Sequence, residues 1–505
     1  MWSFRAALGL TVLGVVLPGV VLWIAGRRKV GGLINVLVLA SCAAVAYMIM
    51  NERLTLLHWA VQPRALVVVT AALCGLAVVW TALIVATYRS VRPTTATIPQ
   101  RLLGSVVVGV LTLAVLTPLA VGGRYALTQR DLIQTVFAAP ASPNDNARSG
   151  ADGSEQAGGR DTGVDTPAPD QGTSRANRAP ADPWNGRTRV NVLLLGGDGG
   201  SDRVGIRTDT VILASIDTRT GHTVLFSLPR NLERIPFEAG SVLAKAYPGG
   251  IYAGAGDQLE WMLTSIYENV PQAHPGLLKG PHPGAQATKL AVSGALNLPI
   301  DYYALVNLKG FEALVDALGG ITVNVNERVA IGGEADANLK PWGYIERGPN
   351  QHMDGWTALW FARGRYGAAD WDRMLRQRCV IKAIVDQANP INFLTRYEKL
   401  AAASKQIITT DIPAQVLPNL VDLSLKVKDT GNLTNIAFTN DVIHVANPDY
   451  KLIRSMVQNA IKESAKSTSG SKSADSLNDV CAYKGKQSGD AATSEARVTR
   501  AQNGT

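Results

Sequence analysis

Four long apolar stretches occupy the first quarter of the chain. They cover approximately residues 6–26, 31–50, 65–87 and 102–121. Each is close to the ~20 residues that a helix needs to cross ~30 Å of hydrocarbon. None offers a polar face to water at the helical period, which argues against a soluble helical domain. The pattern predicts a transmembrane region of four helices within residues 1–125.

Basic residues between these stretches predict how the chain is oriented. The first and third loops contain Arg27, Arg28, Lys29, Arg89, Arg92 and Arg101. Loops rich in Lys and Arg stay in the cytoplasm. Four crossings would therefore place the short N-terminus and the large polar remainder outside. We expect a multi-pass protein of the cell membrane with an extracytoplasmic catalytic domain, and we expect the first stretch to remain as an anchor.

The polar remainder divides into three parts by composition. Residues 138–186 are rich in Ala, Gly, Pro, Asp, Ser and Thr, with almost no branched aliphatic or aromatic residues. Such a segment buries too little apolar surface to offset its ordering entropy, so it predicts a flexible extracytoplasmic linker. Residues 465–505 have a similar composition and predict a mobile tail. Residues 187–464 have the hydrophobic content of a globular domain.

Hydrophobic periodicity within residues 187–464 predicts an α/β domain. Alternating or short apolar runs predict strands at 189–195, 210–217, 222–228, 301–308 and 321–325, with the second and third forming a hairpin. A 3.6-residue period predicts helices at 257–269, 309–318, 355–362, 371–388, 393–404, 414–427 and 449–462. This order indicates a mixed sheet between helices, an α/β/α layering.

Two carboxylates follow or begin neighbouring predicted strands. Asp198 lies in the glycine-rich turn after the first strand, and Asp209 begins the second. Both could meet at one end of the sheet, where two oxygen ligands suit Mg²⁺, an ion that also accepts phosphate oxygens and water. The alternative is that the segment around Asp198 is only a turn, because Asp and Gly are common turn residues.

Cationic side chains recur close to these carboxylates in the sequence. The predicted anion-binding set is Arg207, Arg230, Arg363, Arg365 and Arg373, with Gln377 one helical turn after Arg373. Lys245 is a further candidate, for which a surface role is the alternative. A single Arg is usually a solvated surface charge, but a group of them suits a phosphate or pyrophosphate, which a guanidinium can bind through two hydrogen bonds. No GxxxxGK[ST], GxGxxG, GxSxG or HExxH motif occurs in the sequence. The net charge of +9 is not gathered into a basic run, so nucleic acid is not expected as a partner.

The four cysteines fall into two pairs. Cys42 and Cys74 lie within predicted spans, whereas Cys379 and Cys481 lie in the predicted extracytoplasmic part. An oxidising compartment favours a disulfide between the latter two. Two free thiols are the alternative.

The motifs of residues 189–389 resemble, in content and order, those of the LytR-CpsA-Psr family, which attaches glycopolymers to the bacterial cell wall. The resemblance is carried by Leu193-Leu194-Leu195-Gly196-Gly197-Asp198, Arg207-Thr208-Asp209-Thr210, Ser227-Leu228-Pro229-Arg230, Lys245-Ala246-Tyr247-Pro248-Gly249-Gly250, Val315-Asp316-Ala317-Leu318-Gly319-Gly320-Ile321, Ala362-Arg363-Gly364-Arg365 and Asp372-Arg373-Met374-Leu375-Arg376-Gln377. The chain departs from the family pattern at Asn231, where Asp is common, and in the residues around Lys245.

This resemblance implies an α/β/α domain that binds a polyprenyl-pyrophosphate-linked polymer, with the lipid in an apolar pocket beneath the sheet. Asp198 and Asp209 would hold Mg²⁺ and, with Arg230, form the catalytic set. Arg207, Lys245, Arg363, Arg365, Arg373 and Gln377 would bind the pyrophosphate.

The implied activity is transfer of a glycopolymer phosphate from polyprenyl pyrophosphate to peptidoglycan in cell-wall assembly. Two alternatives stay open at this point: a non-catalytic receptor for the lipid-linked polymer, and a pyrophosphatase acting on the same substrate.

Overall fold

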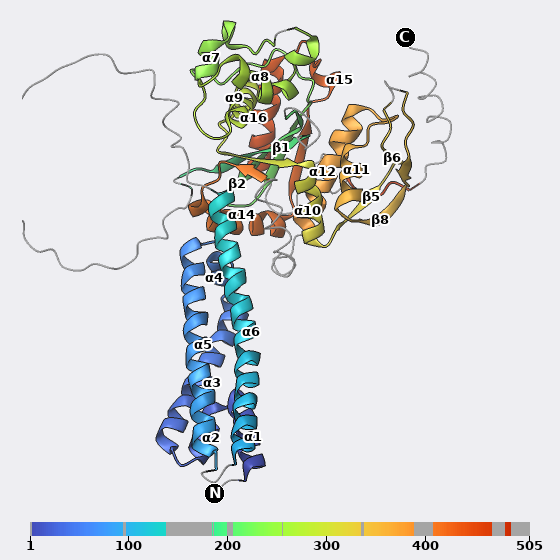
Figure 1. Ribbon diagram of the computed structural model, residues 1–505. Coiled ribbons are helices and arrows are strands. Elements are labelled where there is room, and N and C mark those ends of the chain that lie inside the picture. Colours follow the sequence, from blue (N-terminus) through green and yellow to red (C-terminus); the bar gives the residue numbers. More distant parts are fainter. Residues whose placement is uncertain are drawn as a thin grey trace, which may run out of the picture. The chain divides into compact units, whose positions relative to one another are not determined.

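The chain forms two compact units in the computed structural model, which describes residues 3–93, 97–137, 184, 186–198, 206–254, 256–334, 338–387, 408–466 and 480–485 (Figure 1). One unit comprises Met1–Ala138 with Pro413–Asp422, and the other comprises Ala139–Ile412 with Leu423–Thr505. Almost all of the predicted linker 138–186, the predicted helix 393–404 and most of the predicted tail 465–505 lie outside the described residues.

The N-terminal unit is helical. Its helices are α1 (Phe4–Val16), α2 (Pro18–Ile24), α3 (Arg28–Asn51), α4 (Arg53–Ala60), α5 (Pro63–Val91) and α6 (Ile98–Val136). Among the described residues, three helices are long and apolar enough to cross a membrane, namely α3, α5 and α6. They correspond to the second, third and fourth predicted stretches.

The first predicted stretch, 6–26, does not form one helix. Pro18, whose ring cannot continue a helix, begins the seven-residue α2 after the thirteen-residue α1. Ala7 and Val21 lie in one buried cluster with Val91. A continuous helix would hold Ala7 and Val21 about 21 Å apart, so the chain folds back between them.

Helix α6 is longer than the predicted span of 102–121. It begins after a capping box at Thr97 and continues to Val136. Its C-terminal half is stabilised by packing, because Ala126 and Ile133 are buried with Leu66 of α5. The apolar run identified the membrane-crossing part of this helix and missed the amphipathic extension.

A six-stranded mixed sheet forms the centre of the C-terminal unit. Its strands, in spatial order, are β10 (Leu433–Ala437), β3 (Thr223–Leu228), β2 (Thr208–Asp217), β1 (Arg189–Gly197), β4 (Tyr302–Asn307) and β9 (Ile408–Thr410). Strand β1 pairs antiparallel with β2 and parallel with β4, and β2 and β3 form the predicted hairpin. The four strands predicted for this region are confirmed, whereas the edge strands β9 and β10 were not predicted.

Helices cover both faces of the sheet (Figure 1). On one face, strand residues such as Leu213 and Phe226 pack against α8 (Ile266–Ala273), α9 (Pro283–Leu296) and α16 (Tyr450–Lys466). On the other face, Ile212 and Leu225 pack against α12 (Asp370–Gln387) and the C-terminal part of α14 (Leu417–Thr430). The predicted α/β/α layering is therefore confirmed.

A second, smaller core lies beside the sheet and carries several site residues. It contains α10 (Leu308–Leu318), β5 (Ile321–Val325), β6 (Val329–Ile331), β7 (Gly343–Ile345), β8 (Gly348–Met353), α11 (Gly355–Arg363) and one face of α12. The strands form two antiparallel pairs, β5–β8 and β6–β7. Helix α10 begins at the side-chain cap of Asn307 and ends at Gly319, which adopts φ 93°. Both of its predicted ends are close to the observed ones.

The remaining elements of the two units are short helices. They are α7 (Val242–Ala246), η1 (Pro248–Gly250), η2 (Gln258–Trp261), η3 (Leu263–Ser265), η4 (Ala414–Val416) and α15 (Asn440–Ile443). The predicted continuous helix 257–269 is wrong in its first half, where η2 and η3 stand instead. There the N–H groups of Leu263 and Thr264 donate to the carbonyls of Leu232 and Arg230, at 2.8 and 2.9 Å. These tertiary hydrogen bonds replace helical ones.

Helix α9 was not predicted at all, although it is buried in the main core. It is buried around most of its circumference and consists largely of small residues, so it has no polar face to create a helical period. An added Cβ at Gly284 would lie 2.2 Å from the Tyr267 carbonyl oxygen, and one at Gly294 would lie 2.1 Å from that of Pro236. Small residues allow this close backbone approach.

Candidate anion-binding site

A β-bulge places Asp209 at one end of the sheet. The β1–β2 ladder pairs Gly196 with Thr210 and Gly197 with Thr208, which leaves Asp209 as the extra residue. A bulge locally bends a strand and re-aims a side chain. Sequence periodicity could not show this, because the extra residue is visible only when both strands are paired.

Asp198 lies at the same end of the sheet, next to this bulge. Its N–H donates to the carbonyl of Arg207 at 3.1 Å, and its Oδ1 accepts from the N–H of Arg207 at 2.9 Å. The carboxylate thus bonds the backbone at the strand end, and the rest of the glycine-rich segment, from residue 199 to 205, lies outside the described residues. The two predicted carboxylates therefore lie at the same end of neighbouring strands.

Arg230 binds the carboxylate of the bulge residue directly. Its Nη1 donates to Oδ1 of Asp209 at 2.6 Å, and the two side chains are 28% and 34% exposed. The backbone of Arg230 is fixed as well, because its carbonyl accepts from the N–H of Thr264 at 2.9 Å. The guanidinium is thus held at the sheet end while part of it faces solvent.

Arg373 reaches the same residue from helix α12. Its Nη2 donates to the backbone carbonyl of Asp209 at 3.3 Å, and the side chain is 3% exposed. Two predicted cations, one on the loop after β3 and one on α12, therefore converge on Asp209. The partly exposed guanidinium of Arg230 presents positive charge at this sheet end, which favours an anionic ligand.

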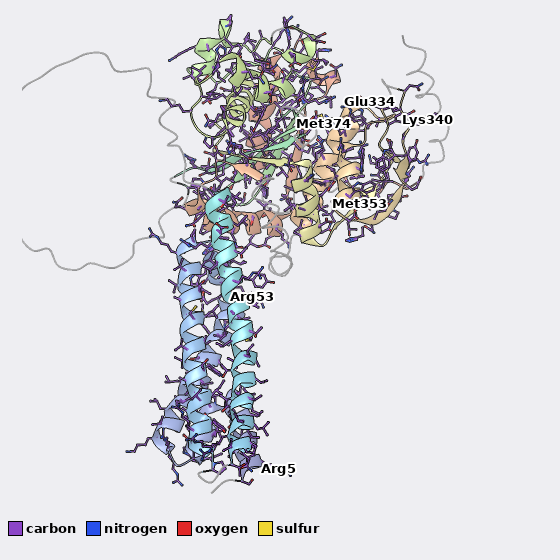
Figure 2. The ribbon with its side chains drawn as sticks, viewed as in Figure 1. Arg5, Arg53, Glu334, Lys340, Met353 and Met374 are labelled. Atoms are coloured by element: carbon purple, nitrogen blue, oxygen red, sulfur yellow. A yellow bond between two sulfur atoms is a disulfide. The ribbon has the colours of Figure 1, made fainter. Side chains whose placement is uncertain are left out.

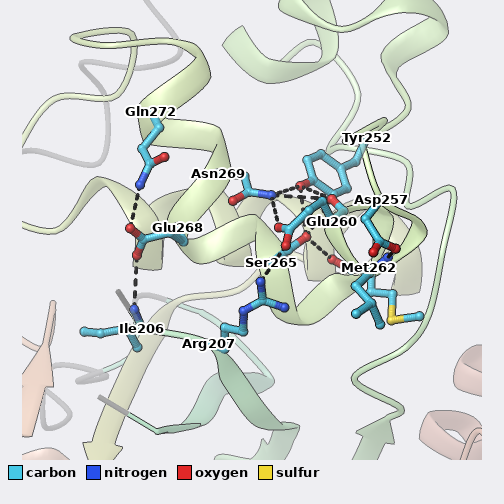
Figure 3. Close-up of polar contacts among 11 residues, drawn as sticks. Ile206, Arg207, Tyr252, Asp257, Glu260, Met262, Ser265, Glu268, Asn269 and Gln272 are labelled. Atoms are coloured by element: carbon cyan, nitrogen blue, oxygen red, sulfur yellow. Dashed lines mark hydrogen bonds and ion pairs between the residues drawn. The ribbon is translucent and has the colours of Figure 1, made fainter. Parts of the chain in front are cut away.

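Arg207 is held by a partner that the sequence did not indicate. Its Nη2 lies 2.5 Å from Oε1 of Glu260, whose Oε2 accepts from Nδ2 of Asn269 at 2.8 Å (Figure 3). The hydrogen bond from Asn269, with that from Arg207, lowers the pKa of Glu260. Glu268 adds a contact to the same loop by accepting from the N–H of Ile206 at 3.0 Å. Because these contacts are distant in sequence, no local motif reports them.

Arg376 positions the end of helix α11, a role that sequence reasoning missed. Its Nε donates to the carbonyl of Phe361 at 2.7 Å, and its Nη2 donates to the carbonyl of Gly364. Arg363 lies between these two acceptors in the sequence, and its Cζ is 4.8 Å from the ring centroid of Trp360. Burial lowers the pKa of Arg376. Helix α12 thus carries Arg373 and also fixes the segment that carries Arg363.

Three predicted residues make no described contact with Arg230 or Asp209. Among the described contacts, none joins Lys245, Arg365 or Gln377 to the pair of Arg230 and Asp209. Lys245 is exposed on α7 and lines an open groove of about 680 Å³. Arg365 is exposed after α11, and Gln377 is half-buried on α12.

The donor set fits a weakly held divalent cation. Within the described ranges, no group of three or more His, Cys, Asp or Glu residues could hold a metal ion. Asp198 and Asp209 offer hard oxygen atoms at one strand end, and Asp209 is partly exposed. Mg²⁺ commonly binds through one or two carboxylates together with substrate phosphates and water, so these residues fit it.

The predicted disulfide between Cys379 and Cys481 is confirmed. The two Cα atoms are 5.6 Å apart, and the bond joins α12 to the segment 480–485. Cys42 and Cys74 are free cysteines on the surfaces of α3 and α5. The bridge fixes the helix that carries Arg373 to a segment about one hundred residues later in the chain.

Fold and site together define an α/β/α domain with arginine and aspartate side chains gathered at one sheet end, an arrangement suited to a phosphate-bearing group. The sequence model of the LytR_cpsA_psr family matches residues 159–467, more than half of the chain. The chain therefore belongs to this family.

Curated relatives cover the same region. One is the polyisoprenyl-teichoic acid–peptidoglycan teichoic acid transferase TagU of Oceanobacillus iheyensis, 30% identical over 235 residues, or 46% of this chain and 62% of the relative. TagU of Enterococcus faecalis is 30% identical over 234 residues, or 45% and 63%. The chain thus spans about three fifths of the length of these relatives.

Among solved structures, B. subtilis TagV is 20% identical, with a TM-score of 0.37, and the match covers 56% of this chain and 98% of TagV. The fold described above rests on the chain's own strand order.

Proposed function

We propose that this protein is a membrane-anchored transferase that moves a glycopolymer phosphate from polyprenyl pyrophosphate to a hydroxyl of peptidoglycan. The observation that carries the proposal is the convergence of Arg230 and Arg373 on the bulge residue Asp209. Family membership and the names of the curated relatives support it, because those relatives are named as teichoic acid transferases acting on peptidoglycan.

The reaction requires charge to move onto a leaving oxygen. The acceptor hydroxyl oxygen attacks the phosphorus that bears the glycan, and the bond from that phosphorus to the bridging oxygen breaks. Polyprenyl monophosphate leaves, a phosphodiester joins glycan to peptidoglycan, and the hydroxyl proton passes to Asp198 or Asp209. Guanidiniums directed at the bridging and leaving oxygens stabilise this charge in the transition state. We assign this role to Arg230, whose guanidinium is partly exposed, while the buried Arg373 holds the backbone of Asp209.

The predicted Mg²⁺ belongs to this proposal. Asp198 and Asp209 would hold the ion, which when bound supplies further positive charge to the pyrophosphate. Arg230 already occupies Oδ1 of Asp209, so the cation would share this carboxylate with the guanidinium. Because two carboxylates bind Mg²⁺ weakly, we expect its affinity to depend on the bound pyrophosphate.

The prenyl chain requires an apolar environment. The layer between the sheet and helices α8 and α9 is the largest apolar region near the site, and its wall includes Leu195, Val211 and Leu228. We place the lipid at this layer, with its pyrophosphate at the strand ends. Helices α8 and α9 would have to move away from the sheet to admit the prenyl chain.

Anchoring in the cell membrane follows from the apolar helices. If α3, α5 and α6 each cross the membrane, the basic segments Arg27–Lys29 and Arg89–Arg101 lie on the same side of it. That side is the cytoplasmic one, because segments rich in Lys and Arg stay in the cytoplasm. The family domain, which follows the third crossing, is then extracytoplasmic. The fourth crossing that the sequence predicts would require residues 6–26 to straighten, so we propose three.

A transfer assay tests the proposal. The full-length protein in detergent would be incubated with Mg²⁺, a labelled polyprenyl-pyrophosphoryl oligosaccharide and peptidoglycan fragments. We expect labelled peptidoglycan and polyprenyl monophosphate in equal amounts, both abolished by Arg230→Ala. Arg219→Ala is the matched control, because Arg219 is exposed in the turn at the opposite end of β2. Equal loss in both variants would contradict the assigned role of Arg230.

The same assay separates the two alternatives. Lipid phosphate released without label on peptidoglycan would indicate a pyrophosphatase. Binding of the lipid-linked oligosaccharide with neither product would indicate a receptor. Either outcome would overturn the transferase assignment.

A further inference from the structure

Three tryptophans form a partly exposed cluster beside Arg363. Trp356 and Trp360 lie one turn apart on α11, and Trp342 comes just before β7. The ring centroid of Trp342 lies 6.0 Å from that of Trp356 and 5.6 Å from that of Trp360. Each pair of rings meets edge to face. Trp342 is 68% exposed and Trp356 is 42% exposed. Such a grouped apolar surface usually marks a binding site.

The backbone below Trp342 fixes the position of its indole. Gly332 adopts φ +70°, and a Cβ added there would lie 1.4 Å from Nε1 of Trp342. The ring therefore lies directly against this glycine. The N–H of Trp342 also donates to the carbonyl of Ile331 at 3.1 Å. Because the ring is already fixed, little side-chain entropy remains to be lost when a ligand binds to it.

Charged residues flank Trp342 and strand β7 along the chain. Figure 2 places Glu334 and Lys340 on the β6–β7 connection that leads to Trp342, and both residues are exposed. Arg328 pairs with Glu346 at 2.9 Å and lies 3.6 Å from the ring centroid of Tyr344 on β7. Exposed aromatic faces match a sugar ring, which has C–H bonds on its faces and hydroxyls around its edge. The negative face of an indole attracts such polarised C–H groups.

We propose that Trp342 and Trp356 form a stacking platform for the sugar rings of the glycopolymer donor. Trp360 links the platform to Arg363, a residue of the predicted pyrophosphate-binding set, because it contacts both Trp342 and Arg363. A pyrophosphate held near Arg363 would direct the attached sugars over these rings. This proposal rests on the proposed function and extends it, since it makes the enzyme sensitive to the length of the glycan.

Fluorine NMR of the full-length protein in detergent tests the platform without requiring activity. The ten tryptophans would be labelled with 5-fluorotryptophan, and Trp342→Phe and Trp356→Phe would assign two resonances. We expect chitotetraose or a mannose tetrasaccharide to shift both resonances in a saturable manner. Leu452→Ala, which removes an exposed apolar side chain on α16, should leave the shifts unchanged. Absence of a shift with both sugars would overturn the platform. A shift that occurs only with phosphatidylglycerol vesicles would assign the surface to the membrane instead.

Kinetics separate this proposal from the transferase assignment. Trp342→Ala should raise KM for a lipid-pyrophosphoryl oligosaccharide about three- to tenfold with kcat unchanged, the size expected for one aromatic stacking contact. Trp342→Phe should restore most of the affinity. A donor with a single sugar should show no difference, because its glycan ends before the platform. Equal effects on short and long donors would contradict the platform, whereas no transfer by the unmodified protein would contradict only the proposed function.

Discussion

Arg230 and Asp209 form an ion pair of 2.6 Å at a β-bulge, where the carbonyl of Asp209 also accepts a hydrogen bond from Arg373. The pair is about one third exposed, and such pairs contribute roughly 0–1 kcal/mol to stability. Its geometry therefore contributes more to positioning charge than to holding the fold together. This separation of roles can be tested by replacing either partner.

Asp209→Asn should reduce transfer by about 10²- to 10³-fold while changing the free energy of unfolding by less than about 1 kcal/mol. The amide keeps the shape of the side chain but removes the charge that orients Arg230 and would bind Mg²⁺. Polyprenyl monophosphate release and thermal unfolding measure the two effects. A large loss of stability with little loss of transfer would show that the pair is structural.

Arg376→Ala should destabilise the C-terminal domain by about 1.5–3 kcal/mol, because it removes hydrogen bonds from a buried charged group to two carbonyls. Activity should fall as well, since the end of α11 carries Arg363. Chemical denaturation would give the stability change. Arg328→Ala is a matched control, because the side chains of Arg328 and Glu346 are 56% and 67% exposed and their ion pair should contribute little. Equal destabilisation by both variants would contradict the positioning role of Arg376.

Gly254→Ala should displace Glu260 and release Arg207. A Cβ at Gly254 would lie 1.9 Å from the carbonyl oxygen of Glu260, which is backbone and cannot rotate away. We expect a cost of about 1–3 kcal/mol and a raised KM for the lipid-linked donor. Gly485→Ala is the control, because no atom lies within 4 Å of an added Cβ there. An unchanged KM in Gly254→Ala would contradict the substrate-binding role of Arg207.

The central strands and the site residues at their ends could be predicted from the sequence. Both leave a signal within a few neighbouring positions, namely a short apolar or alternating run for a strand and a local motif for a site residue. Asp198, Asp209 and Arg230 are examples. Helix α9 was not predicted, because buried small residues produce no amphipathic period. The structure of segment 257–265 was not predicted, because Leu263 and Thr264 donate hydrogen bonds to Leu232 and Arg230, more than thirty positions away, in place of helical ones.

The partners of the site residues were less predictable than the residues themselves. Glu260 meets Arg207 across 53 positions, and Arg376 reaches the carbonyls of Phe361 and Gly364 from the next helix. Their identities depend on tertiary packing, for which no single motif exists. The bulge at Asp209 likewise requires knowledge of which residue stands opposite it.

Asp354 makes the stability of helix α11 dependent on pH. Its Oδ1 accepts from the N–H of Thr357 at 2.8 Å, and hydrogen bonds from Thr357 lower the pKa of Asp354. A lowered pKa means that this stabilisation is complete above the ordinary Asp pKa of about 3.9 and is lost as pH falls through the folded-state pKa. Asp354→Ala should therefore cost about 0.5–2 kcal/mol at neutral pH and less in acid. Asp354→Asn should retain most of the cap. Unfolding midpoints measured from neutral pH to about pH 3 would show this, and a cost independent of pH would exclude the ionised cap.

Reduction of the disulfide between Cys379 and Cys481 should destabilise the domain and release the segment 480–485. The bridge closes a separation of 102 positions, for which chain entropy gives up to about 4.7 kcal/mol, and we expect about 2–4 kcal/mol because measured bridges often give less. The released segment would lose the hydrogen bonds that Asn324 and Asn326 donate to the carbonyls of Cys481 and Ala482. Hydrogen exchange should therefore accelerate in 480–485 and around 324–326 after reduction. The double variant Cys379→Ser/Cys481→Ser should exchange hydrogen as the reduced protein does, and adding reductant should not change its exchange further. The control variant Cys42→Ser/Cys74→Ser keeps the disulfide, so reductant should accelerate its exchange as in the unmodified chain. Unchanged exchange in both segments after complete reduction would show that the remaining contacts alone hold this segment against the domain.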